Sequence, residues 1–276
     1  MSWHGRLSLH YTRDGGCTTA RDRHHGPLRV LQRLYPEGPG VCHHVLVHPP
    51  GGMVGGDRLE IDVTLDAAAH ALITTPGATR FYRSSGAEAS QQVQLRVAGG
   101  GRLEWLPLET LAYRGCLGLN QVRLDLALGA EAMGWDVLAL GLPAAGQAFD
   151  SGRFTQHLEL GGAWLERARI DAGDRRLLDS PLGLGGHRVL GTLWWAEGAP
   201  LAPARRQALL DAARDALAAG PLSQRAGATA PQPAVVVVRL LAGGVEPAMQ
   251  ALAAVRAAWR RLAWGLAAEP PRIWRM

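Results

Sequence analysis

Cysteine and histidine side chains are concentrated in one short segment that begins at Cys42. If residues 41–48 form a β-strand, Cys42, His44 and His48 project to the same side, because side chains alternate along a strand. Thiolate and imidazole suit zinc, nickel and copper, so these three residues could serve a β-rich metalloenzyme. The alternative is a buried cysteine with histidines bonded to the backbone, because residues two apart on a flat strand do not converge on one ion.

Carboxylates form a second group with metal chemistry. Glu60 and Asp62 share the polar side of one alternating segment, which is typical of a solvated sheet face. The alternative is a polar internal channel, in which oxygen ligands pass a divalent cation weakly from site to site. The carboxylates in or beside β-like segments are Asp57, Glu60, Asp62, Glu104 and Glu109.

Two Gly-Gly pairs flank Met53 and Val54 and predict a loop with positive φ angles or close backbone approach. The loop is not a phosphate-binding P-loop, because no Gly-Lys-Ser/Thr follows and the chain contains no lysine. Gly-x-Gly-x-x-Gly, Gly-x-Ser-x-Gly, His-Glu-x-x-His and Cys-x-x-Cys patterns are also absent from the sequence. The common enzyme signatures are therefore missing.

The composition is that of a globular protein with a substantial core. The 276 residues are 47% hydrophobic and 19% charged, and we expect one domain over residues 1–276. No apolar run approaches the roughly 18 residues of a membrane span, and the N-terminus lacks a secretory apolar region. Three cysteines cannot all pair within one chain, which favours a reducing, cytoplasmic location.

The positive charge favours a protein partner over nucleic acid. There are 29 basic residues, all arginine, against 24 acidic ones, giving a net charge of +5. The arginines are scattered, whereas a nucleic-acid site needs them gathered on one face. We therefore expect no nucleic-acid partner and interpret the charge as complementary to an acidic protein surface.

Periodicity predicts a mainly β protein with a stacked, β-helix-like or β-sandwich architecture and two C-terminal α-helices. Short alternating segments about ten residues apart, with no helix between them, argue against βαβ units. Beyond this part, three- and four-residue spacing of apolar residues predicts helices. The expected segments are a β core at about 28–195, a helix at about 203–219, a loop at 221–233, a strand at 234–241, a helix at about 246–266 and a C-terminal tail at 270–276.

Several strings, in order along nearly the whole chain, resemble the urease accessory protein family UreD, also called UreH. The longest is LITTPGATRFYRS, which begins at Leu72. The others are YPEG at 35–38, HPPGGMVGGDRL at 48–59, LEWLPLET at 103–110, DSPL at 179–182, LGTL at 190–193 and PRIWR at 271–275.

The resemblance implies a non-enzymatic maturation factor with a mainly β, stacked fold and two helices. Members of the family bridge apo-urease to the accessory proteins UreF and UreG, and UreG is the GTPase. The resemblance further implies chaperoned nickel insertion into the urease metallocentre and a polar internal route for the metal. A nickel-delivering metallochaperone would act only indirectly, and no tightly bound cofactor is expected, only transient Ni²⁺.

Residues are carried over only where the strings match. The family-motif positions include Thr74, Thr75, Arg83 and Ser84. We expect a transient nickel route to use Asp57, Glu104, Glu109, His48 and Cys42, and we expect Ile273 and Trp274 to bind a partner or pack inward. The sequence departs from the family pattern at Leu108, Leu142 and Gln147, where polar or charged groups are usual.

Overall fold

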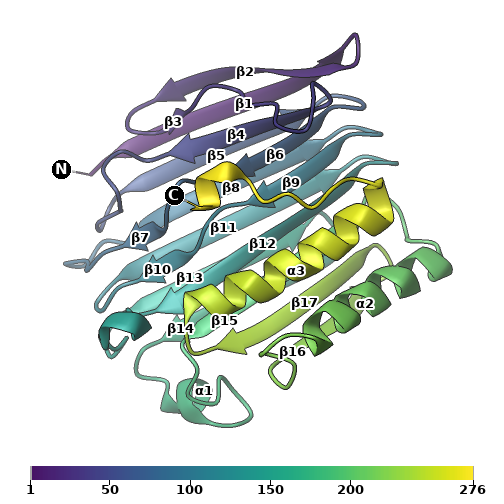
Figure 1. Cartoon of the computed structure of the whole chain (residues 1–276). Coiled ribbons are helices and arrows are strands. Elements are labelled where there is room, and N and C mark those ends of the chain that lie inside the picture. Colours follow the sequence, from purple (N-terminus) through teal and green to yellow (C-terminus); the bar gives the residue numbers. More distant parts are fainter. Residues whose placement is uncertain (1, 276) are drawn as a thin grey trace.

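Two β-sheets packed face to face form most of the molecule, and the computed structural model describes residues 2–275 (Figure 1). In spatial order, the seven-stranded sheet contains β14 (Trp164–Asp171), β13 (Arg153–Leu160), β11 (Leu117–Leu126), β8 (Ala89–Val97), β5 (Arg58–Leu65), β1 (His4–Asp14) and β2 (Cys17–His25). The ten-stranded sheet contains β16 (Ala226–Gln232), β17 (Val235–Ala242), β15 (Val189–Glu197), β12 (Glu131–Leu140), β9 (Arg102–Leu106), β6 (His70–Thr74), β4 (Val41–Val47) and β3 (Arg29–Val30), with β10 (Thr110–Ala112) beside β12 and β7 (Thr79–Phe81) beside β10.

The chain alternates between the two sheets and stacks one coil on the next. Strands β5, β8 and β11 pair in parallel in one sheet, while β6, β9 and β12 pair in parallel in the other. The predicted stacked, β-helix-like class is confirmed, with the addition of a third, short helix. Stacking brings residues from successive coils into register, which places side chains far apart in sequence next to one another.

The burial of each strand reflects which faces of its sheet are covered. Along β5, Leu59, Ile61, Val63 and Leu65 are buried and the intervening residues are not, because the outer face of the seven-stranded sheet is open. Every residue of β6 is buried, since the ten-stranded sheet is covered on both faces. The molecule thus has two cores, one between the sheets and one between the ten-stranded sheet and the helices.

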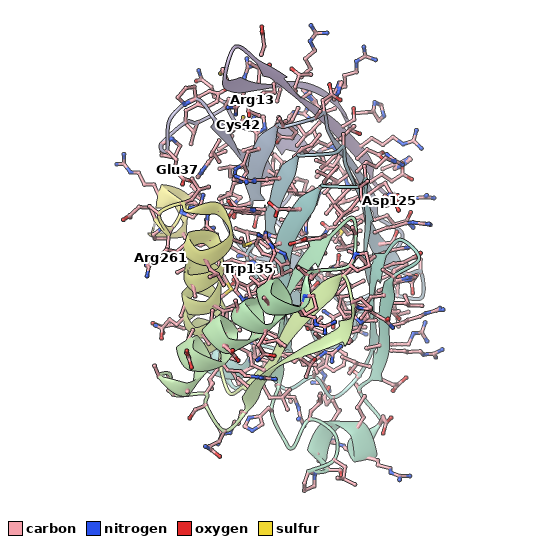
Figure 2. All side chains as sticks on the ribbon, turned by 90° about the vertical axis from the view of Figure 1, so that its right-hand side faces the viewer. Arg13, Glu37, Cys42, Asp125, Trp135 and Arg261 are labelled. Carbon is pink, nitrogen blue, oxygen red and sulfur yellow. The ribbon has the colours of Figure 1, made fainter. Side chains whose placement is uncertain are left out.

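Two long helices, α2 (Pro203–Ala218) and α3 (Val245–Trp264), cover the outer face of the ten-stranded sheet. Figure 2 shows them on one side of the molecule, with Trp135 near them and Asp125 on the opposite side. The Trp259 indole joins the helices by donating Nε1–H to the backbone oxygen of Leu209, at 2.8 Å. Within the described residues, no helix has the length and apolar character of a membrane span. The other helical segments are α1 (Arg175–Asp179), η1 (Pro143–Ala145) and η2 (Arg272–Arg275).

Two boundaries differ from those expected. The β core begins at His4 and not near residue 28. Buried and exposed residues alternate along β1, but the exposed ones include histidine and arginine, and this polar composition hides the alternation. The segment 221–233, expected to be a loop, contains β16. This strand lies at a sheet edge and has an irregular register between Thr229 and Gln232, and such a position tolerates Pro231.

Candidate functional site

A strip of amide side chains crosses the space between the two sheets. Gln91 on β8, Asn120 on β11 and Gln156 on β13 occupy the same register position on three adjacent strands. The Gln91 Nε2 donates to the Asn120 Oδ1 at 3.2 Å. Amides in this position face an otherwise apolar core, so each needs a hydrogen-bonding partner within the strip.

Asp136, on β12 of the opposite sheet, completes the strip. Its Oδ2 accepts a hydrogen bond from the Asn120 Nδ2 at 2.8 Å, and its Oδ1 accepts one from the Gln156 Nε2 at 2.5 Å. Loss of solvation raises the pKa of Asp136 to about 6, Glu166 adds to the rise, and the two amide bonds oppose it. The strip therefore holds an interior carboxylate that ionises just below neutral pH.

The strip connects two cavities. The smaller, about 30 Å³, is lined by Asp136, Gln156 and Glu166 among others. The carboxylate of Glu166 is ion-paired with Arg239 of β17, at the open edge of the sandwich. Trp105 lines both this cavity and the larger one, which has a volume of about 210 Å³.

The larger cavity has a different electrostatic character. Five polar residues line it, His48, Thr75, Thr79, Arg80 and Gln91, and apolar residues form most of the remaining wall. Within the described residues, no aspartate or glutamate lines it. Acidic oxygen ligands are therefore found at the Asp136 end of the strip, and the opposite end has a guanidinium.

A polar path of this kind suits weak and transient cation binding. Carboxylate and amide oxygens are ligands for hard and borderline divalent cations. Over the part of the chain that the structure describes, no group of three or more His, Cys, Asp or Glu side chains could hold a metal ion.

The five residues expected on a nickel route lie in separate environments. Asp57 is almost fully buried and accepts the backbone N–H groups of Trp3 (2.7 Å) and Val54 (2.9 Å), so its carboxylate organises the glycine-rich loop. Glu109 is half-buried, and its backbone oxygen accepts from the N–H of Thr79. His48 lines the larger cavity, and burial lowers its pKa.

Glu104 is fully buried on the helix-covered face of the ten-stranded sheet. Its Oε2 lies 2.9 Å from the Arg256 Nη2, and its Oε1 lies 3.1 Å from the Arg260 Nε and 3.3 Å from the His70 Nε2. Burial alone would raise the pKa of Glu104, but Arg256, His70 and Arg260 outweigh it and lower this pKa to about 2. Its carboxylate is therefore already neutralised by arginine.

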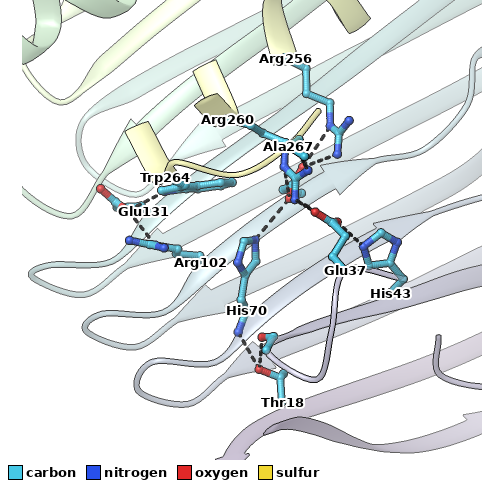
Figure 3. Close-up of polar contacts among 12 residues, drawn as sticks. Thr18, Glu37, His43, His70, Arg102, Glu131, Arg256, Arg260, Trp264 and Ala267 are labelled. Carbon is cyan, nitrogen blue, oxygen red and sulfur yellow. Dashed lines mark hydrogen bonds and ion pairs between the residues drawn. The ribbon is translucent and has the colours of Figure 1, made fainter. Parts of the chain in front are cut away.

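The same network reaches the N-terminal part of the chain, as Figure 3 shows. The Arg260 Nη2 donates to both oxygens of Glu37, at 3.0 and 2.8 Å. The Glu37 Oε1 also lies 2.7 Å from the His43 Nε2. Two guanidinium groups and two carboxylates thus join α3, β9 and the segment before β4 into one buried ionic cluster.

Cys42 and His44 face the core between the sheets. Burial raises the pKa of the Cys42 thiol to about 11 and is the main cause that lowers the pKa of His44 to about 4. The Nδ1 of His44 lies 2.7 Å from the hydroxyl oxygen of Tyr11. A protonated thiol and an imidazole already bonded to tyrosine give the metalloenzyme alternative, which also needs His48, no structural support.

The motif threonines serve structural roles on the two faces of the ten-stranded sheet. The Thr74 hydroxyl donates to the Leu106 oxygen at 2.6 Å. The Thr75 Oγ1 accepts from the Leu108 N–H at 2.9 Å, so Leu108 contributes its backbone here. Arg83 is exposed, and the Ser84 hydroxyl bonds to the Ala87 oxygen within the same turn.

The C-terminal tail packs inward. The Trp274 Nε1 donates to the Thr74 Oγ1 at 2.7 Å, and its ring lies 5.1 Å from that of Trp135, between centroids. Ile273 beside it is half-buried. Leu142 and Gln147, two departures from the family pattern, pair through their backbones across the turn that contains η1.

The stacked sheets and the buried strip define a β-helix-like protein with a polar path through its interior. A family model described as UreD urease accessory protein matches residues 4–275. The chain is 61% identical to the urease accessory protein UreD of Leptothrix cholodnii and 59% identical to that of Verminephrobacter eiseniae, each over the full length of both chains. It is 56% identical to the UreD of Variovorax paradoxus over 99% of both chains. The chain belongs to the UreD family of urease accessory proteins.

Proposed function

We propose that the chain acts in urease maturation, as a non-catalytic accessory protein that offers nickel a polar route between its two sheets. Membership of the UreD family supports the role in maturation. The observation that carries the nickel route is Asp136, an interior carboxylate that is held by two amides at one end of a strip between two cavities.

The route works by weak and exchangeable contacts. The pKa of Asp136, raised to about 6, leaves most of this carboxylate ionised at neutral pH. Asn120 and Gln156 can turn their amide oxygens toward a cation, since an amide carries both donor and acceptor groups. A site that bound nickel tightly would not release it, so a low number of fixed ligands suits transfer.

In this proposal the chain works as a scaffold in the cytoplasm. It bridges apo-urease to a complex of UreF-like and UreG-like proteins, and a UreG-like GTPase hydrolyses the nucleotide. Its net charge of +5 supports docking on an acidic protein surface. We therefore expect raised salt to weaken the partner complex, whereas a complex insensitive to salt would contradict electrostatic docking.

The test is urease activation in cells that co-express apo-urease and the other accessory proteins at fixed, limiting nickel. Omitting this chain should abolish activation, and equal activity without it would refute the accessory role. The variant Asp136→Asn combined with Glu166→Gln removes both carboxylates of the smaller cavity and should reduce activation strongly. Asp62→Asn, on the outer face of the seven-stranded sheet, is the matched control and should leave activation unchanged.

Pull-down of the partner proteins separates the two parts of the proposal. If the double variant retains its partners but loses activation, the defect lies in nickel transfer. Wild-type activation by a folded double variant would contradict the interior route and leave the scaffold role intact.

A further inference from the structure

The larger cavity contains a guanidinium, that of Arg80, for which the described part of the chain supplies no ion-pair partner. Arg80 is half-buried on β7, and its Nη1 donates to the backbone oxygen of Gly51 at 3.2 Å. No ion pair of Arg80 occurs within the described residues, whereas Arg58, Arg96 and Arg123 on the outer sheet face are all paired with carboxylates. A concave site with one unpaired guanidinium is suited to an anion.

The neighbouring side chains complete a polar end of this cavity. His48 lines it, and burial lowers the pKa of this imidazole, so the ring is neutral at pH 7 and has one N–H to donate. Thr75 and Gln91 also line the cavity, and the Thr75 hydroxyl is already bonded to the Gly77 oxygen. A guanidinium fork and one ring N–H match a planar carboxylate group.

The rest of the wall selects against multiply charged anions. Leu46, Leu59, Ile61 and Trp105 line the cavity and present hydrocarbon surface. A dianion such as hydrogen phosphate would lose much of its hydration in this cavity, and the Arg80 guanidinium would supply only one positive charge against its two negative charges. A monoanion with a short hydrocarbon body gains both from the guanidinium and from apolar contact.

We propose that this cavity binds a small aliphatic monocarboxylate, with its carboxylate on Arg80 and His48 and its hydrocarbon part against the apolar wall. The site lies at the end of the strip opposite Asp136. Its occupancy requires no nickel and no partner protein, so it can be tested independently of the role in urease maturation.

The experiment is saturation-transfer NMR of butyrate with the purified full-length chain, without nickel. We expect a dissociation constant of about 1–10 mM, as one charge-assisted contact and a small apolar surface allow. Arg80→Gln should weaken binding about tenfold or more. Arg80→Lys keeps the charge without the fork and should give an intermediate value. Arg83→Gln, an exposed arginine outside the cavity, is the control and should bind as the wild type does.

Two further ligands test the chemistry. Formate, which lacks the hydrocarbon body, should bind more weakly than butyrate, and phosphate should not displace butyrate at equal concentration. Butyrate binding that is unchanged in Arg80→Gln, or no binding by the wild type, would overturn the proposal, as would displacement by phosphate. If Arg80→Gln does not fold, Arg80→Lys decides: wild-type affinity in that variant would contradict recognition by the guanidinium fork.

Discussion

Glu104 on β9 and Arg256 on α3 form an ion pair in the interior of the protein, with the Arg256 Nε donating to the Glu104 Oε2 at 3.0 Å. Both residues are almost completely buried, and Arg260 contributes a second guanidinium to the same carboxylate. This cluster attaches α3 to the sheet through charge as well as through apolar packing. Each member depends on the others, because an isolated charge in this position would lose its solvation without compensation.

Glu104→Gln should destabilise the protein by about 3–5 kcal/mol, because it leaves the Arg256 and Arg260 guanidinium groups with one fewer carboxylate in a buried site. The measurement is the free energy of unfolding in urea. Glu159→Gln is the matched control, since Glu159 forms its ion pairs on the open sheet face and its loss should cost less than about 1 kcal/mol. Equal effects of the two substitutions would contradict the assigned role of the cluster.

The Glu104 contribution should also depend on pH. The pKa of Glu104 is lowered from 4.5 to about 2 in the folded chain, so its stabilising effect is complete above pH 4.5 and is lost as the pH falls toward 2. The difference in unfolding free energy between wild type and Glu104→Gln should therefore shrink over this interval. A difference that stays constant down to pH 2 would show that Glu104 is not held ionised by its arginines.

Asp136 should show the opposite pH dependence. Its pKa is raised from 3.8 to about 6 on folding, so ionising it costs stability as the pH rises from about 4 to 6. Asp136→Asn removes this cost and should become more stable relative to the wild type by about 1–3 kcal/mol over that interval. Urea unfolding at several pH values measures the difference. Parallel stability curves for the two proteins would contradict the raised pKa.

Trp274→Ala should destabilise the protein by about 2 kcal/mol, less than for a fully buried tryptophan, because Trp274 is half-buried. The loss comes from the contact with Trp135 and from the hydrogen bond to Thr74. Trp3→Ala is the control, since Trp3 is 56% exposed, and should cost little. Unchanged stability of Trp274→Ala together with loss of a partner would instead assign the tail to docking.

The three thiols should differ in reactivity toward a disulfide reagent. Burial raises the pKa of Cys42 to about 11 and that of Cys116 to about 12, whereas Cys17 is partly exposed. The Cys17 thiol should therefore react rapidly in the folded chain, and all three thiols should react rapidly in urea. Cys17→Ser should remove the fast phase. Fast modification of Cys42 would show that its thiolate is available and would reopen the metalloenzyme alternative.

Local pattern predicted the elements of the fold well where one face of a sheet is exposed. The alternation from Leu59 to Leu65 identifies β5, and the buried run from Val235 to Val238 lies in β17 as expected. The N-terminal strand was missed because its outward residues, His4, Arg6, Ser8 and His10, dominate the composition, while Gly5, Leu7, Leu9 and Tyr11 are buried behind them. The amino-acid composition of a strand combines the residues of both its faces, whereas the burial of each residue separates the two faces.

The candidate site was less accessible to sequence reasoning. Asp136 is the carboxylate inside the otherwise apolar run 132–140 of β12, and one charged residue within such a buried run is the signal that could have found it. Gln91, Asn120 and Gln156 give no such signal, because they become neighbours only when successive coils stack in register. Glu104, the carboxylate that the sequence predicts on the nickel route, lies on the other face of the same sheet. Without the register of the strands, the sequence does not show which of the two faces a residue occupies.

Thr74 and Thr75 lie on opposite faces of the ten-stranded sheet, at the end of β6. The first accepts the indole N–H of Trp274, and the second lines the larger cavity. A single peptide unit therefore separates the residue that holds the C-terminal tail from a residue of the cavity wall. Because the peptide group is stiff and planar, a displacement of Thr74 by the tail would also move Thr75 at the cavity wall.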